Sequence, residues 1–315
     1  MTCRLLHVFV FLAVAGLAVA GLAVKAIAQS PIPLEQRSWV VRNQAKDGSF
    51  SGVDGKPSLE ETSLIALALI GEGNQLAKGT YAPQLCRAMR WLVAQQKPDG
   101  TLEADGPGCT RRLGLIAYTL VEAVGRSEEK GPMRAAAELA LKAMFARRHA
   151  DGGFGDPKAS SDALSTYWCV VSAASAEAFR LKVAVPAAKL VEWFDGHSGV
   201  TGEQVGCELL ARFMVGQDPG KSPMMFKLAD VLVTKANPAM PVESYLTTYA
   251  LFSLGGQHWR TWKKKLERTL VRTQLRDGKD HGAWPPAGSL SRAATTAFGY
   301  LTLQGYYRYP GLLPK

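Results

Sequence analysis

Gln44-Ala-Lys-Asp47-Gly48-Ser-Phe50 is a turn that returns along the chain at a fixed interval. Gly48, Gly100 and Gly152 are each 52 residues apart, and each copy of the turn sets Asp-Gly before an apolar or aromatic side chain. A fixed period of this size indicates a repeat architecture. The later copies are Gln96-Lys-Pro-Asp99-Gly100-Thr-Leu102, His149-Ala-Asp151-Gly152-Gly153-Phe154 and the longer Gln274-Leu-Arg-Asp277-Gly278 to Gly282-Ala-Trp284.

Two kinds of helix are predicted to alternate between these turns. Helices of the first kind are apolar and lack a charged face, which is typical of burial on all sides. They are predicted at 59–70, 110–124, 162–178, 202–215, 243–254 and 291–306. Helices of the second kind carry Lys and Arg on one face, and Pro132 and Pro186 suit first-turn positions. They are predicted at 34–44, 82–96, 132–148, 186–194, 224–236 and 259–274.

Six buried and six surface helices in alternation predict an all-α fold, an (α/α)6 toroid with an inner ring wrapped by an outer ring. No alternating strand pattern of useful length competes with this interpretation. The even repeat has no linker, so we expect the toroid to form one domain at residues 29–315.

The first 28 residues have the features of a secretory signal peptide. Arg4 supplies the basic start, residues 5–24 are continuously apolar, and Ala26-Ile-Ala28 offers a small-x-small cleavage site. We therefore expect a protein exported to a periplasm or secreted. The alternative is an uncleaved anchor, because the apolar run is about as long as a membrane-spanning helix. Membrane attachment is expected through this segment only.

The charge of +10 for the whole chain falls to +8 when Arg4 and Lys25 are removed with the signal peptide. The basic residues are spread over the surface helices, with a denser run at 260–276. We interpret them as a solvated surface. No nucleic-acid-binding motif is present, so nucleic acid is not an expected partner, whereas contact with an anionic membrane surface or a polyanion stays open.

Four cysteines remain after the predicted cleavage, and their spacing matches no zinc signature. Cys86 and Cys109 lie in the same repeat and are candidates for a disulfide in an oxidising compartment. Cys169 and Cys207 lie inside apolar helices, where we expect buried free thiols.

The turns resemble degenerate QW motifs of squalene–hopene cyclases. The segment Tyr245-Leu-Thr-Thr-Tyr249 to Trp262, followed by Gln274, Asp277-Gly278 and Trp284, is similar to exported bacterial proteins with squalene cyclase or prenyltransferase repeats. The resemblance covers nearly the whole chain after the signal peptide. It implies the α/α toroid of terpenoid cyclases, prenyltransferase β subunits and complement thioester domains. Because proteins with this fold have three different functions, the fold alone does not determine the function of this chain.

The catalytic groups that the resemblance implies are largely missing. Cyclases of this family protonate an alkene with Asp-x-Asp-Asp at the start of an inner helix. This chain keeps one acid there, Asp162, which we interpret first as a helix cap. Prenyltransferases hold zinc with Asp, Cys and His, but Leu164 and Thr295 stand at the Cys and His positions. We therefore expect no metal and no cofactor.

A second class of function is a secreted hydrolase of glycans, which needs two carboxylates about 5–10 Å apart in a cleft. Six acids fall near the starts of inner helices, where a pair could converge at one rim. The alternative is that acids favour helix N-termini through the helix dipole. The six are Glu60, Glu61, Asp162, Glu203, Glu208 and Glu243.

The sequence thus favours a binding or scaffold protein that has lost the family's catalytic motifs. We expect it to take an apolar small molecule, for example an isoprenoid, or a protein partner. The alternative is an enzyme, either an atypical terpenoid cyclase using Asp162 or a glycan hydrolase. Candidates for lining a central cavity are Asp162, Tyr118, Tyr167, Trp168, Tyr245, Tyr249 and Arg292, with Phe298 and Tyr300 on the same helices.

Overall fold

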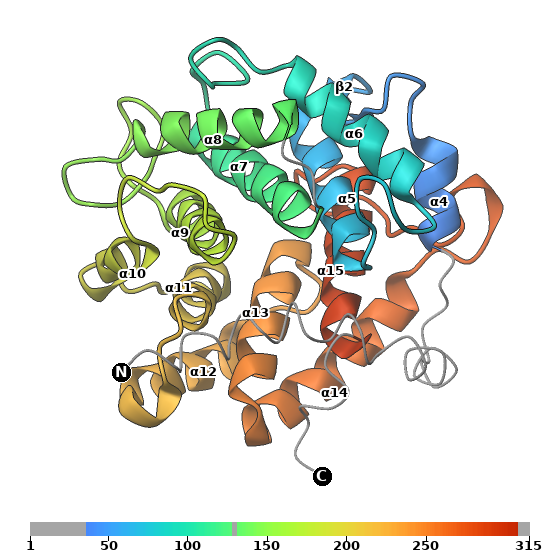
Figure 1. Cartoon of the computed structure of the whole chain (residues 1–315). Coiled ribbons are helices and arrows are strands. Elements are labelled where there is room, and N and C mark those ends of the chain that lie inside the picture. Colours follow the sequence, from blue (N-terminus) through green and yellow to red (C-terminus); the bar gives the residue numbers. More distant parts are fainter. Residues whose placement is uncertain (1–35, 128–130, 308–315) are drawn as a thin grey trace.

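A computed structural model describes residues 36–127 and 131–307, and the predicted signal peptide lies outside these residues. Each apolar helix contacts the next one along the chain, and the last contacts the first, so the six form a closed inner ring (Figure 1). The inner helices are α5 (Leu59–Gly71), α7 (Cys109–Arg126), α9 (Ala163–Ala178), α11 (Gly202–Met214), α13 (Pro241–Leu254) and α15 (Arg292–Tyr307). The predicted all-α toroid is confirmed.

The amphipathic helices surround this ring. They are α4 (Gln36–Asn43), α6 (Ala82–Ala94), α8 (Pro132–Phe145), α10 (Ala187–Leu190), α12 (Pro223–Lys235) and α14 (Gly256–Thr273). Short 3-10 turns lie at Val191–Asp195, Pro219–Lys221 and Gly278–Asp280. The strands in the described residues are β1 (Phe50–Ser51) and β2 (Pro57–Ser58), an antiparallel pair before α5.

Hydrogen bonds from the first two repeated turns link an outer helix to the next one. The Gln44 side-chain amide donates to the Gly48 carbonyl at 3.0 Å and to the Gln84 carbonyl of α6 at 2.8 Å. Gln96 makes the corresponding bonds in the next repeat, and its partner on α8 is the carbonyl of Ala136. In the third repeat Arg148 takes the place of the glutamine and donates to the Gly152 carbonyl at 3.0 Å.

The aromatic residue of each turn is also tied to the following inner helix. The Phe50 amide donates to the Thr62 hydroxyl at 2.9 Å, and Phe154 with Thr166 and Trp284 with Thr296 repeat this bond at 3.0 and 3.1 Å. In all three pairs the threonine follows the aromatic residue by 12 positions. The second repeat has Gly114 at that offset and lacks the hydroxyl. These turns therefore have a structural role.

The four cysteines of the described residues do not pair. Cys86 is half-buried in α6, Cys109 is buried at the start of α7, and both are free thiols, as are Cys169 and Cys207. The disulfide considered between Cys86 and Cys109 is thus not formed in this structure. Within the described ranges, no helix is both long enough and apolar enough to cross a membrane.

Candidate functional site

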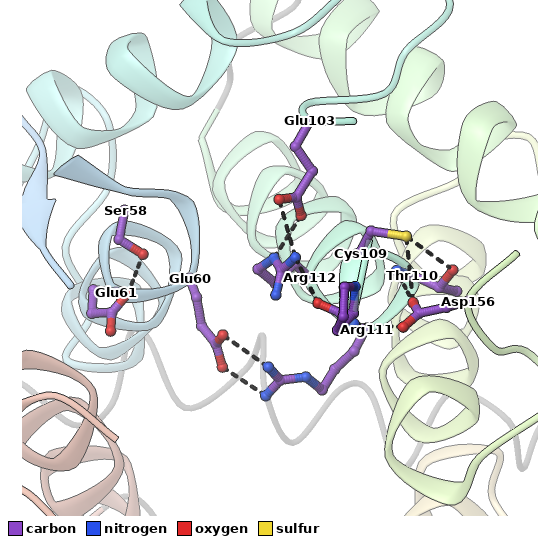
Figure 2. A network of polar contacts seen from close by, with 11 residues as sticks. Ser58, Glu60, Glu61, Glu103, Cys109, Thr110, Arg111, Arg112 and Asp156 are labelled. Carbon is purple, nitrogen blue, oxygen red and sulfur yellow. Dashed lines mark hydrogen bonds and ion pairs between the residues drawn. The ribbon is translucent and has the colours of Figure 1, made fainter. Parts of the chain in front are cut away.

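The N-terminal ends of the inner helices open on one side of the toroid, the side on which the repeated turns lie. We call the charged residues gathered there the mouth. It comprises Glu60 of α5, Arg111 of α7, Asp162 before α9, Glu203 of α11 and Glu243 of α13. Glu60 and Arg111 form a bidentate ion pair, with nitrogen–oxygen distances of 2.7 and 3.0 Å (Figure 2). Figure 2 shows both side chains reaching across the gap between α5 and α7.

Glu203 is the acid of the mouth whose protonation is most clearly affected by its surroundings. Partial burial raises its pKa, because the charged carboxylate loses hydration, and the negative charges of Glu243 and Asp162 raise it further. The positive charge of Arg111 acts in the opposite direction, but the pKa stays above its ordinary value. Glu203 is therefore an acid that holds its proton to a higher pH than a solvated glutamate does.

Glu243 lies against the start of the helix that carries Glu203. Its Oε2 accepts a hydrogen bond from the Asn237 amide at 2.8 Å. The same oxygen occupies the space beside Gly202, where an added Cβ would come within 2.6 Å of it. Gly202 thus provides the room that lets a carboxylate of α13 approach α11 so closely.

Two of the six predicted acids are not at the mouth. Glu61 is buried between α5 and α15, where it accepts hydrogen bonds from the hydroxyls of Ser58 and Ser291. Glu208 is fully buried and pairs with Arg212 one turn later, at 2.7 Å. Glu61 thus links α5 to the start of α15, whereas Glu208 forms its ion pair within α11, and the expectation that they belong to a rim pair is not supported by their positions.

Asp162 occupies the N-cap position of α9. Its Oδ1 accepts a hydrogen bond from the Ser165 amide at 2.8 Å, and its side chain is exposed. This is the geometry of a helix cap. An acid strong enough to protonate an alkene must be held protonated in a dry site, and an exposed cap is not in such a site.

At two positions that correspond to zinc ligands of prenyltransferases, this chain has Leu164 and Thr295. Leu164 is half-buried at the start of α9, and Thr295 lines a cavity of about 80 Å³ between α13, α14 and α15. In the part of the chain that the structure describes, no three His, Cys, Asp or Glu side chains gather in a way that could hold a metal ion.

The aromatic residues of the inner helices pack against one another. Trp168 lies at the middle of the group, with ring centroids 5.0 Å from Tyr167, 6.1 Å from Tyr118 and 6.1 Å from Tyr245. The hydroxyls of Tyr167 and Tyr245 are 3.2 Å apart, and Tyr245 also contacts Tyr249 at 5.2 Å. The fold therefore brings these aromatic residues together, and they pack against one another.

Arg292, the remaining cavity candidate, lies at the start of α15 and pairs with Asp280 at 2.7 Å. Neither the cavity between α13, α14 and α15 nor the one beside Cys109 is lined by Arg292 or by the aromatic group. The central ligand cavity that we expected from these side chains stays a prediction.

Sequence reasoning missed one polar network beside the mouth. Asp156 accepts hydrogen bonds from the amides of Gly108 and Thr110 and from the Cys109 thiol, so it caps α7 from the neighbouring repeat (Figure 2). Burial alone would raise its pKa, but the amide hydrogen bonds outweigh burial and lower it. Arg112 pairs with Glu103 at the same place. The only sequence signal was an acid after a Phe-Gly turn, which predicts no partner 46 residues earlier.

No protein-family model matches the chain. A stretch of 89 residues, 28% of the chain, is 34% identical to drimenyl diphosphate synthase of Streptomyces showdoensis and spans 17% of that protein. The type II terpene cyclase MstE from Scytonema superposes with a TM-score of 0.54 at 12% identity, covering 87% of this chain and 95% of that chain. The fold is thus an α/α toroid similar to that of MstE.

Toroids that act on glycans are similar to the same extent. The GH76A α-1,6-mannanase from Salegentibacter superposes with a TM-score of 0.65 at 10% identity, covering 86% of this chain and 96% of that chain. A novel α-amylase from Clostridium perfringens gives 0.58 at 10% identity over the same shares. At these identities the likeness concerns the fold only, so the toroid's function rests on its own residues.

Proposed function

We propose that this toroid is an exported glycan hydrolase that works at its mouth, with Glu203 as the general acid and Glu243 as the general base. The observation that carries the proposal is the raised pKa of Glu203 beside a second carboxylate from the neighbouring inner helix. A carboxylic acid with a raised pKa beside a second carboxylate supplies the two groups that acid–base hydrolysis requires.

The chemistry needs both groups in different protonation states. The Glu203 carboxyl gives its proton to the glycosidic oxygen while the bond from that oxygen to the anomeric carbon breaks. A water molecule forms the new bond to the anomeric carbon, and its proton passes to the Glu243 carboxylate. The Glu60–Arg111 pair keeps a positive charge close to Glu203, which limits how far the pKa of the acid rises.

The position of the mouth favours hydrolysis over cyclisation. Glu203 and Glu243 are each partly exposed, so water and a polar polymer can reach them. Cyclisation of a polyprene needs a dry, apolar chamber beside the acid, whereas the aromatic residues of the inner ring pack on each other and Asp162 is exposed. The solved structures that share the fold include an α-1,6-mannanase and an α-amylase, so this fold accommodates glycan hydrolysis in other proteins.

A specific observation favours a second candidate, the binding protein. Three exposed apolar side chains stand on loops that lead into inner helices: Val53 before α5, Val200 before α11 and Met240 at the start of α13, with 74%, 70% and 43% of their surface exposed. An apolar rim around the mouth suits docking of a protein partner or an apolar molecule. This candidate needs no proton transfer by Glu203.

Hydrolysis by the purified protein should depend on Glu203. On polysaccharides that release reducing ends, with α-1,6-mannan among them, Glu203→Gln should lower kcat by at least about 100-fold, because general acid catalysis contributes that much. The wild-type rate should fall as pH rises through the raised pKa of Glu203, since the acid must be protonated. Glu138→Gln on the outer helix α8 is the matched control and should keep full activity. A panel on which the wild type releases no reducing ends, or on which Glu203→Gln is fully active, would leave the binding protein as the better candidate.

The pH dependence of the protein's stability should reveal the raised pKa of Glu203 without any substrate. The folded chain holds the Glu203 proton to a higher pH than the unfolded chain does, so the free energy of unfolding decreases as pH rises above the ordinary glutamate pKa. Glu203→Gln removes this loss. Its melting temperature should exceed that of the wild type at pH 8 and match it at pH 4. Equal differences at both pH values would show that Glu203 is solvated.

A further inference from the structure

Helix α14 carries an unbroken row of cations along its outer face. Exposed Lys and Arg side chains recur at every fourth position, which places them one above the other on a helix. The buried side chains of α14 point in the opposite direction, toward the inner ring, and Figure 1 shows α14 on the outside of the toroid. The basic row is Arg260, Lys264, Arg268 and Arg272, and the buried face is Trp259, Trp262, Leu266 and Leu270.

The chain does not neutralise this row. None of its four members forms an ion pair with a carboxylate in the described residues. Glu267 of the same helix is turned toward Lys263, off the row, at 3.8 Å. On the neighbouring α12, Asp230 pairs with His258. Like charges four residues apart repel and destabilise a helix, so the row carries a cost that no ion pair of its four members offsets within the described residues.

An exposed aromatic ring lies on the neighbouring helix α12. Phe226 of α12 is 43% exposed, and its ring centroid is 6.3 Å from that of His258 in the first turn of α14. The Lys265 ammonium donates to the Val233 carbonyl of α12 at 2.7 Å, which fixes the two helices to each other. A cluster of four cations on one face of a helix is the composition that binds anionic lipid head groups, and an exposed aromatic ring on the neighbouring helix can enter the membrane interface.

We infer that the outer face of α14, with Phe226, docks the toroid on the surface of an anionic lipid bilayer. The row advances about 6 Å per step and spans about 18 Å from Arg260 to Arg272, so it faces several lipid head groups at once. The partner follows from this chemistry: its surface is negatively charged, extended and able to accept an aromatic ring. The row is on the side wall of the toroid, so the mouth stays open to solvent when the protein is docked.

The test compares partition of the full chain, purified as an exporting host processes it, onto two kinds of vesicle. One kind is phosphatidylcholine with about 30% phosphatidylglycerol and the other is phosphatidylcholine alone. The ratio of the two partition constants isolates the electrostatic part from any binding by the N-terminal apolar segment. One variant replaces all four row residues by Gln. The matched control replaces four exposed lysines on other repeats, Lys46, Lys78, Lys97 and Lys182, so that both variants lose the same charge.

The wild-type ratio should exceed about tenfold, because each basic residue at an anionic surface strengthens binding severalfold. The row variant should bring the ratio near one, while the four-lysine control keeps at least half of the wild-type ratio. Phe226→Ser should weaken binding to the anionic vesicles and leave retention on soluble polyphosphate unchanged. Equal loss in the row variant and the control would overturn the inference. So would tight binding to polyphosphate without binding to the vesicles, which would assign the row to a soluble polyanion.

Discussion

Replacing Gly100 with alanine should lower the free energy of unfolding by about 3 kcal/mol, and Gly48→Ala should do the same. Both glycines have positive φ, +89° and +101°, which costs an alanine about 1–2 kcal/mol. An added Cβ would also come within 2.4 Å of a backbone oxygen of the next outer helix, that of Leu139 or Arg87. A backbone oxygen cannot rotate away as a side chain does, so the outer helix must shift, which adds a further packing penalty.

The repeat supplies its own control. Gly278 has φ of +68° but nothing within 4 Å of an added Cβ, and beside Gly152 (φ +92°) only the flexible Arg148 side chain lies close. Alanine at either position should cost only the backbone strain, about 1–2 kcal/mol. Urea unfolding of the four alanine variants measures the difference. If all four lose the same stability, then the turns do not rest directly on the neighbouring outer helices and the packing account is wrong.

The 52-residue period and the alternation of helix types were enough to predict the toroid and most helix bounds to within a few residues. The segment 186–194 was predicted as one outer helix, but it forms a four-residue helix followed by a 3-10 turn. Consecutive large side chains, Trp193 and Phe194, are both buried there. A 3-10 turn places side chains three residues apart on the same face, and Val191 and Phe194, which have this spacing, are both buried.

The candidate site was less predictable, because helix starts can be located in a sequence but facing directions cannot. Glu60 and Glu61 are neighbours in the chain, yet Glu60 pairs with Arg111 at the mouth and Glu61 is buried against Ser291 of α15. Which of the two faces the mouth depends on the rotation of α5 within the ring. Glu203 was one of six acids in the sequence, and its partial burial, together with the neighbouring Glu243 and Asp162, distinguishes it.

The aromatic residues of the inner helices were also predicted only in part. Their positions on inner helices were expected, and their rings do lie together, with Trp168 and Tyr245 stacked at 6.1 Å. A sequence shows that such residues face inward, but whether they line a space or fill it depends on how closely the helices approach. Gly114 of α7 lets α9 come close, since a Cβ there would lie 3.0 Å from that of Trp168.

Trp168→Ala should therefore act on stability, with a loss of about 3–5 kcal/mol in the free energy of unfolding. Its side chain is 2% exposed and contacts three other aromatic rings, so truncation leaves a large cavity where four inner-helix rings met. The matched control is Trp91→Ala on the outer helix α6, where the ring is only partly buried and the loss should be about half as large or less.

Asp162→Asn should leave stability almost unchanged, because asparagine caps a helix about as well as aspartate, whereas Asp162→Ala should cost about 1 kcal/mol. Thermal and urea unfolding of these variants show whether the aromatic residues serve packing or line a functional site. A Trp168→Ala protein that keeps the wild-type melting temperature would mean that the ring lines an accessible space after all. In that case the apolar-ligand candidate would regain its site, and loss of isoprenoid binding in the same folded variant would identify it.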